Sequence, residues 1–176
     1  MEYFKFFSVA FLVMLGTQSC RDPSSSPVEI KGRIAKMESE FLVSDKSIRQ
    51  DSSALELLRL YDAYANSFPS DTLAPEYLFK AGELCNGMED YRKAVAYFEM
   101  YAENYPSEKR AADVIFLQGF IHENQFKNFE KARVLYESFL EKFPGHPLAK
   151  DIRIALANLG KTDEELIRDF EKKNAL

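Results

Sequence analysis

Between residues 78 and 106 the sequence reads Leu78-Phe-Lys-Ala-Gly-Glu-Leu-Cys85, then Asn86-Gly-Met-Glu89, then Asp90-Tyr-Arg-Lys-Ala-Val-Ala-Tyr-Phe-Glu-Met-Tyr-Ala-Glu-Asn-Tyr-Pro106. Apolar side chains recur at helical spacing on both sides of the short glycine-containing turn. Proline ends the second segment, because it cannot continue a helix. The stretch therefore predicts two amphipathic helices joined as a hairpin.

The same pattern recurs along the chain at a nearly constant period. Gly82, Ala94 and Pro106 are followed, in the same order, by Gly119, Ala132 and Pro144. The interval between the glycines is one residue shorter than the interval between the alanines, so one residue is added in the second turn. The ending phrase occurs three times, as Tyr64-Ala-Asn-Ser-Phe68-Pro69, Tyr101-Ala-Glu-Asn-Tyr105-Pro106 and Phe139-Leu-Glu-Lys-Phe143-Pro144. A fixed period of this size indicates stacked helical repeats, in which no unit buries its apolar face alone.

Composition agrees with one folded domain and argues against two classes of partner. The chain has 176 residues, of which 46% are hydrophobic and 29% charged, and its net charge is −5. Nucleic-acid binding needs a basic surface to neutralise phosphates, and so does electrostatic attachment to anionic lipid. The net negative charge therefore argues against nucleic acid and against anionic lipid as partners.

The N-terminus indicates export. Residues 6–15 form a ten-residue apolar run after Lys5, which is too short to span a bilayer but suits a signal-peptide core. The run leads to Ser19-Cys20, which resembles the lipobox of bacterial lipoproteins, although Thr17 stands where an aliphatic residue is usual. The alternative is ordinary cleavage after the small residues Thr17 and Ser19.

These features divide the chain into three parts. We expect a signal peptide at residues 1–19, a lipid-anchored flexible tether at 20–29 and a helical repeat domain at 30–176. The tether is rich in serine and proline and cannot bury apolar surface. At the other end, Thr162 with Glu165 forms a capping-box signature for a final amphipathic helix, which we expect to cap the open end of the stack.

The repeat places resemble those of the tetratricopeptide family. Its signature puts Leu-Gly on the first helix, and alanine, an aromatic residue and a terminal proline on the second. The matching residues here are Ala81, Gly82, Ala94, Phe98 and Pro106, followed by Gln118, Gly119, Ala132, Tyr136 and Pro144. The resemblance covers roughly residues 54–160. It implies an all-α fold, a short right-handed solenoid of antiparallel helix pairs with a C-terminal capping helix.

Side chains suited to catalysis are scarce, so we predict no enzyme, no metal and no cofactor. The two histidines, His122 and His146, have no second ligand at metal spacing. His122 lies on an apolar helical face and is expected to be a core residue with a satisfied ring nitrogen, and His146 is expected to cap a helix. Cys85 takes an inward place, as an inert buried thiol.

Binding is the remaining function. In proteins of the tetratricopeptide family the first helix of each pair lines the concave side and holds a partner segment. Phe79 and Phe116 each follow a core residue directly and so point about 100° away from it. We therefore expect an exposed aromatic and acidic groove for a segment with apolar anchors and Lys or Arg. The matched places are Glu76, Phe79, Glu83, Asp113, Phe116, Phe120, Glu123, Asp151, Ile154 and Asn158.

The repeats are similar to those of two envelope groups, the repeat lipoprotein of the outer-membrane β-barrel assembly machine and the periplasmic repeat protein of the Tol–Pal system. This likeness implies an envelope lipoprotein at the outer membrane, facing the periplasm, that serves as an interaction scaffold without nucleic-acid or small-molecule substrates. Two alternatives stay open. One is a self-association module, and the other is an accessory subunit of a wall-modifying or uptake enzyme complex.

Overall fold

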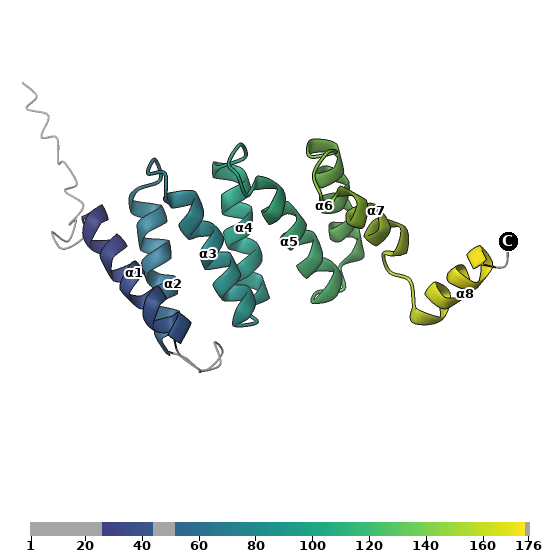
Figure 1. Cartoon of the computed structure of the whole chain (residues 1–176), viewed down its shortest axis with the longest axis horizontal. Coiled ribbons are helices and arrows are strands. Elements are labelled where there is room, and N and C mark those ends of the chain that lie inside the picture. The colour runs from purple at the N-terminus through teal and green to yellow at the C-terminus, as the bar shows by residue number, and fades with distance from the viewer. Residues whose placement is uncertain (1–25, 44–51, 175–176) are drawn as a thin grey trace, which may run out of the picture.

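A computed structural model describes residues 26–43 and 52–174. These residues form helices and contain no strand, as the repeat pattern predicts. Figure 1 shows the helices following one another in a row from the N-terminal to the C-terminal end. The helices are α1 (Pro27–Val43), α2 (Ser52–Ser67), α3 (Ala74–Gly87), α4 (Tyr91–Asn104), α5 (Ala111–Asn124), α6 (Phe129–Lys142), α7 (Ala149–Asn158) and α8 (Asp163–Asn174).

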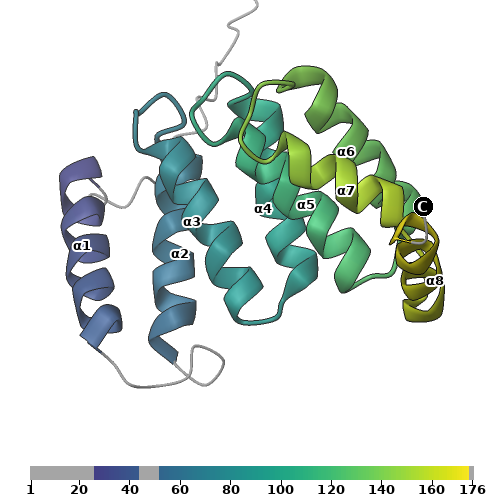
Figure 2. The ribbon, with the colours of Figure 1, turned by 45° about the vertical axis from the view of Figure 1, so that its right-hand side comes forward.

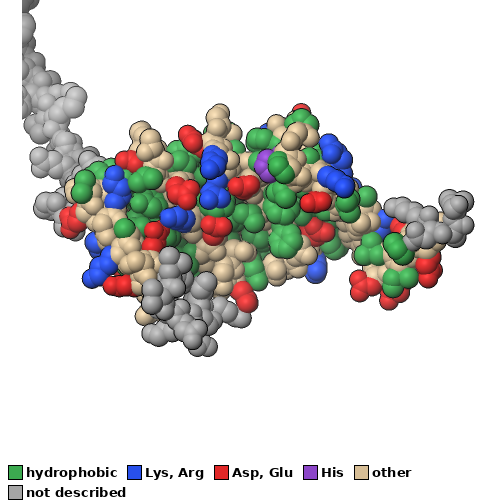
Figure 3. Space-filling model, in the orientation of Figure 1, with side chains coloured by type: hydrophobic (Ala, Val, Ile, Leu, Met, Phe, Trp, Pro, Cys, Tyr) green, Lys and Arg blue, Asp and Glu red, His purple; other side chains and the backbone are tan. Residues whose placement is uncertain are grey.

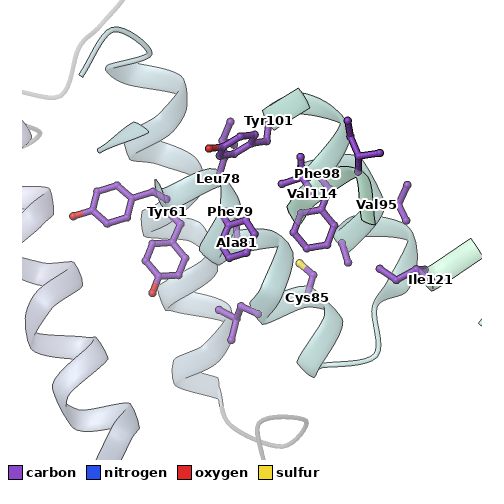
Figure 4. Close-up of a cluster of buried hydrophobic side chains, with 14 of the residues drawn as sticks. Tyr61, Leu78, Phe79, Ala81, Cys85, Val95, Phe98, Tyr101, Val114 and Ile121 are labelled. Atoms are coloured by element: carbon purple, nitrogen blue, oxygen red, sulfur yellow. The ribbon is translucent and has the colours of Figure 1, made fainter. Parts of the chain in front are cut away.

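From α1 to α7, each helix packs against the next one in the chain, most extensively within the pairs α3–α4 and α5–α6. This arrangement confirms the all-α solenoid of helix pairs. Figures 1 and 2 show the first helices α3, α5 and α7 following one another along one side of the stack. One continuous apolar core runs through it, and Figure 4 shows the part between α2 and α5.

The two glycines mark the closest approach within each pair. A Cβ atom at Gly82 would lie 2.4 Å from Cε1 of Phe98, and one at Gly119 would lie 2.6 Å from Cε1 of Tyr136. Neither distance leaves room for a methyl group, so the rings of α4 and α6 lie directly on the backbone of α3 and α5. Ala94 and Ala132 are fully buried. The repeating glycines and alanines therefore occupy helix–helix contacts.

Cys85 lies in the same cluster as Phe98 and is fully buried (Figure 4). Burial raises the pKa of its thiol to about 11, and the negative charge of Asp90 adds to this effect. The thiol is therefore protonated at neutral pH and shielded from reagents, which confirms the prediction of a buried thiol.

The turns within the pairs explain why the second unit carries one additional residue. In each turn a non-glycine residue has positive φ, Glu89 at 62° and Lys127 at 52°. Each is followed by a capping residue: Asp90 accepts a hydrogen bond from the Lys93 amide, and Asn128 accepts one from the Lys131 amide. The extra residue lies between the end of α5 and Asn128, the N-cap of α6.

The N-terminal boundary differs from the predicted one. Helix α1 begins at Pro27, so residues 27–29 belong to the helical domain and not to the tether. The Ser26 hydroxyl accepts a hydrogen bond from the Glu29 amide at 3.2 Å and so caps the helix, and proline is well tolerated at the first helical position. The predicted signal peptide, Cys20 and the first part of the tether lie outside the described residues.

The C-terminal end also differs from the prediction. The Thr162–Glu165 capping box forms, with the Thr162 amide 2.9 Å from Glu165 Oε2 and the Glu165 amide 3.3 Å from Thr162 Oγ1. Yet α8 makes only sparse contact with the stack, and Ile167 and Phe170 are 59% and 68% exposed. Figure 1 shows α8 standing beyond α7. The expectation that this helix caps the stack is therefore wrong.

Helix α7 itself ends the repeat pattern. Equivalent backbone hydrogen bonds start α3, α5 and α7, from Tyr77 to Leu73, Val114 to Arg110 and Ile152 to Leu148. In this register Arg153 takes the place of the buried core residues Leu78 and Ile115, and Arg153 is exposed. A charged side chain thus stands where another second helix would have to pack.

Candidate interaction surface

The same register places the predicted binding residues, except Glu123, in three rows across α3, α5 and α7. We call this surface the first-helix face. One row is acidic, a second is apolar, and the third is mixed. The rows are Glu76, Asp113 and Asp151; Phe79, Phe116 and Ile154; and Glu83, Phe120 and Asn158.

Phe79 does not belong to an exposed groove. It is 2% exposed, and its ring lies 5.9 Å from that of Phe98 and 6.4 Å from that of Tyr101, measured between centroids. Its remaining side is covered by Arg110, whose guanidinium carbon lies 4.1 Å from the ring centroid. The prediction that Phe79 is exposed is therefore wrong, because a side chain from the next repeat lies over it.

Arg110 also engages two of the predicted acids. Its Nε atom lies 3.4 Å from Oε2 of Glu76, and its Nη1 atom lies 3.6 Å from Oδ2 of Asp113. By the backbone register, Arg110 takes the place that leucine holds in the neighbouring units, at Leu73 and Leu148. The N-terminal part of the first-helix face thus already carries a cation stacked on an aromatic ring between two carboxylates.

The C-terminal part of this face remains apolar and accessible. Phe120 is 46% exposed and Ile154 is 52% exposed, while Phe116 is half-buried with its ring 6.0 Å from that of Phe120. Figure 3 shows hydrophobic side chains gathered over α5 and α7, whereas charged side chains are interspersed over α1, α3 and the start of α5. The structure therefore brings Phe116, Phe120 and Ile154 to one side of the stack.

The other predicted polar residues have different surroundings. Glu123 accepts a hydrogen bond from the Tyr136 hydroxyl at 2.7 Å, so its carboxylate is tied to the core of the α5–α6 pair. Asn158 lies 3.4 Å from the Lys161 ammonium, and Asp151 is exposed in the first turn of α7, where helix amides favour a negative charge.

Glu83 differs from these acids. Its side chain reaches solvent, yet the surrounding protein surface withdraws part of its hydration and raises the pKa of its carboxyl. Arg110 and Lys80 oppose this shift, whereas Glu76 and Asp113 add to it. Within residues 26–43 and 52–174, no hydrogen bond or ion pair reaches Glu83. Its charge is therefore only partly compensated.

The described part of the chain shows no metal site and no membrane span. No group of three His, Cys, Asp or Glu side chains in it is arranged to hold an ion. None of its helices combines the length and the apolar character that crossing a bilayer requires. His146 accepts a hydrogen bond from the Leu148 amide at 3.3 Å in the turn before α7, but the N-cap of that helix is Leu148, so the prediction that His146 caps a helix is wrong.

His122 differs from its prediction. Its ring packs edge-on against Phe126 at 5.2 Å between centroids, as a core residue would, but neither buried ring nitrogen has a hydrogen-bond partner in the described structure. Burial lowers the pKa of this imidazole, and the positive charge of Lys131 lowers it further, while Glu99 opposes the shift. The prediction of a satisfied nitrogen is wrong.

The lowered pKa makes stability depend on pH. A neutral His122 is favoured in the folded protein, so the unfolded chain binds a proton first as pH falls below about 6.5. Stability should thus be fully present above pH 6.5 and decline as pH falls through the folded pKa. A His122→Leu variant should lose less stability than the parent between pH 7.5 and pH 5 in urea unfolding. A His146→Asn variant, which keeps a side-chain acceptor for the Leu148 amide, should follow the parent, and equal losses for all three proteins would contradict the assignment.

Comparison with known families supports the repeat assignment. The tetratricopeptide repeat family matches residues 76–107 and 113–146, which correspond to the pairs α3–α4 and α5–α6. Both helix pairs are therefore similar to tetratricopeptide repeats. No curated protein matches the chain. Tetratricopeptide repeats generally mediate protein–protein contacts and are typically non-catalytic, so the match suggests an interaction scaffold.

Sequence reasoning missed two residues of the helical stack, namely Arg110 and Arg153. Both could have been found by comparing equivalent repeat positions, because Arg110 replaces the leucines at 73 and 148, and Arg153 replaces the apolar residues at 78 and 115. The contacts that Arg110 makes with Phe79 and Glu76 of α3 join two repeats, so the sequence pattern of a single repeat does not predict them. They required the structure.

Proposed function

We propose that this protein is a non-catalytic scaffold of the bacterial cell envelope, exported by its N-terminal apolar segment and anchored through lipid on Cys20. The anchor would hold the repeats at the outer membrane, facing the periplasm. The short apolar run that ends at Ser19-Cys20 supports export and anchoring. The repeats would hold a segment of another protein in an envelope complex.

The observation that carries the binding role is the exposed apolar surface on α5 and α7. Phe120 and Ile154 expose about half of their side chains on successive first helices, beside the half-buried Phe116. An apolar cluster rimmed by polar residues tends to mark an interaction site. Aromatic anchors at such sites commonly supply most of the binding energy when they are desolvated.

Site-specific photo-crosslinking in living cells tests this role. A photoreactive phenylalanine analogue replaces Phe120 or Ile154 in the full-length chain, and adducts are isolated from the envelope and identified by mass spectrometry. We expect the same adduct protein from both positions. Radioactive palmitate added to the same cultures should label the parent chain and should not label a Cys20→Ser variant.

Two exposed apolar residues outside the first-helix face provide matched controls. Leu55 on α2 and Val134 on α6 are each 60% exposed, more than either test residue. The analogue at these positions should not yield the common adduct. If adducts form only from Leu55 or Val134, the binding surface lies elsewhere, and absence of palmitate label from the parent would overturn the anchor.

A further inference from the structure

Three of the acids on or beside the first-helix face are already engaged within the protein. Glu76 and Asp113 share Arg110, at 3.4 Å and 3.6 Å, and Glu123 accepts the hydroxyl proton of Tyr136 at 2.7 Å. Glu83 is exposed and has neither an ion pair nor a hydrogen bond among the described residues, although the neighbouring protein surface removes part of the hydration of its carboxyl. A partly desolvated carboxylate is stabilised by a nearby cation.

Glu83 stands next to the accessible apolar part of the face. It occupies in α3 the place that Phe120 occupies in α5, so the two side chains follow each other across successive first helices. On the other side, Arg110 covers Phe79 and fills the space between Glu76 and Asp113. A peptide segment that lies across this face from α3 to α5 would therefore contact Glu83 first and then Phe116 and Phe120.

We propose that the partner is a peptide segment that places one Lys or Arg on Glu83 and sets adjacent apolar side chains against Phe116, Phe120 and Ile154. This inference rests on the proposed function and specifies its partner. Charge complementarity places the basic residue at Glu83, because Arg110 already pairs with Glu76 and Asp113, and Glu123 accepts a hydrogen bond from the Tyr136 hydroxyl. The same arginine confines the apolar anchors to α5 and α7.

Selection from a displayed library of random 12-residue peptides tests the proposal. The full-length parent chain is the target, and the selected peptides are then measured against variants by fluorescence anisotropy. We expect peptides with one basic residue beside apolar residues. Glu83→Gln should weaken them about fivefold, as for an exposed ion pair, whereas Glu137→Gln, which removes an exposed acid from α6, should leave binding unchanged.

A gain-of-binding variant provides the complementary measurement. Arg110→Leu installs the residue found at the equivalent positions 73 and 148, so the fold should tolerate it, and it frees Glu76 and Asp113. Selection on this variant should enrich peptides with two or more basic residues. Enrichment identical to that of the parent would overturn the assigned role of Arg110.

The outcomes separate this inference from the function on which it rests. Peptides that lose binding on Phe120→Ser but not on Glu83→Gln would overturn the basic-residue assignment and leave the apolar docking surface intact. Failure to select any peptide that is sensitive to Phe120→Ser would overturn the docking surface itself.

Discussion

Replacing Phe98 with alanine should lower the free energy of unfolding by about 3–5 kcal/mol. The Phe98 ring is fully buried, lies on the backbone of Gly82 and packs 5.9 Å from the ring of Phe79. Its removal leaves a cavity between α3 and α4 that the two helices cannot close without moving their neighbours. Urea unfolding followed by circular dichroism measures the loss.

A phenylalanine outside the core serves as the control. Phe170 on α8 is 68% exposed, so Phe170→Ala should change the free energy of unfolding by no more than about 0.5 kcal/mol. Equal unfolding midpoints for the two variants would show that Phe98 does not hold the α3–α4 pair together.

Replacing Gly82 with alanine should cost about 1–3 kcal/mol, although alanine is the better helix former. The added Cβ would lie 2.4 Å, 2.7 Å and 2.9 Å from three carbons of the Phe98 ring. That ring is enclosed on all sides, so the overlap outweighs the gain in helix propensity. The cost should shrink in a Phe98→Leu background, since the smaller side chain leaves space for the methyl group.

Gly32 on α1 offers the opposite case in the same protein. A Cβ at Gly32 would meet no atom within 4 Å, so Gly32→Ala should stabilise by about 0.5–1 kcal/mol. If Gly82→Ala lowers the free energy of unfolding and Gly32→Ala raises it, then packing, and not helix propensity, explains the glycine at position 82. A stabilising Gly82→Ala variant would refute the close approach of α3 and α4.

The repeat could be predicted from sequence because its signal is local and periodic. Glycine, alanine and proline at fixed spacing report steric requirements that each hairpin meets within itself, as the burial of Ala94 and Ala132 shows. The inward place of Cys85 followed from the same register. These predictions needed no knowledge of how neighbouring units meet.

Features that depend on neighbouring units could not be predicted in the same way. Phe79 points away from Leu78 as helix geometry requires, but Arg110, which belongs to the next repeat, covers it. The orphaned nitrogens of His122 depend on what packs around the ring, which helix periodicity does not specify. The amphipathic pattern of α8 predicts an apolar stripe, but it does not determine whether the stack offers a surface to bury it.

The exposed Arg153 on α7 also disfavours end-to-end stacking of a second molecule on the repeats. Units that stack on one another could in principle accept a unit from a second molecule, and repeated addition would produce a linear polymer whose length depends on protein concentration. Covering the Arg153 guanidinium without a counter-charge would cost on the order of several kcal/mol, which opposes the first step of such growth. We therefore expect the exposed Arg153 to oppose concentration-dependent growth at this end of the stack.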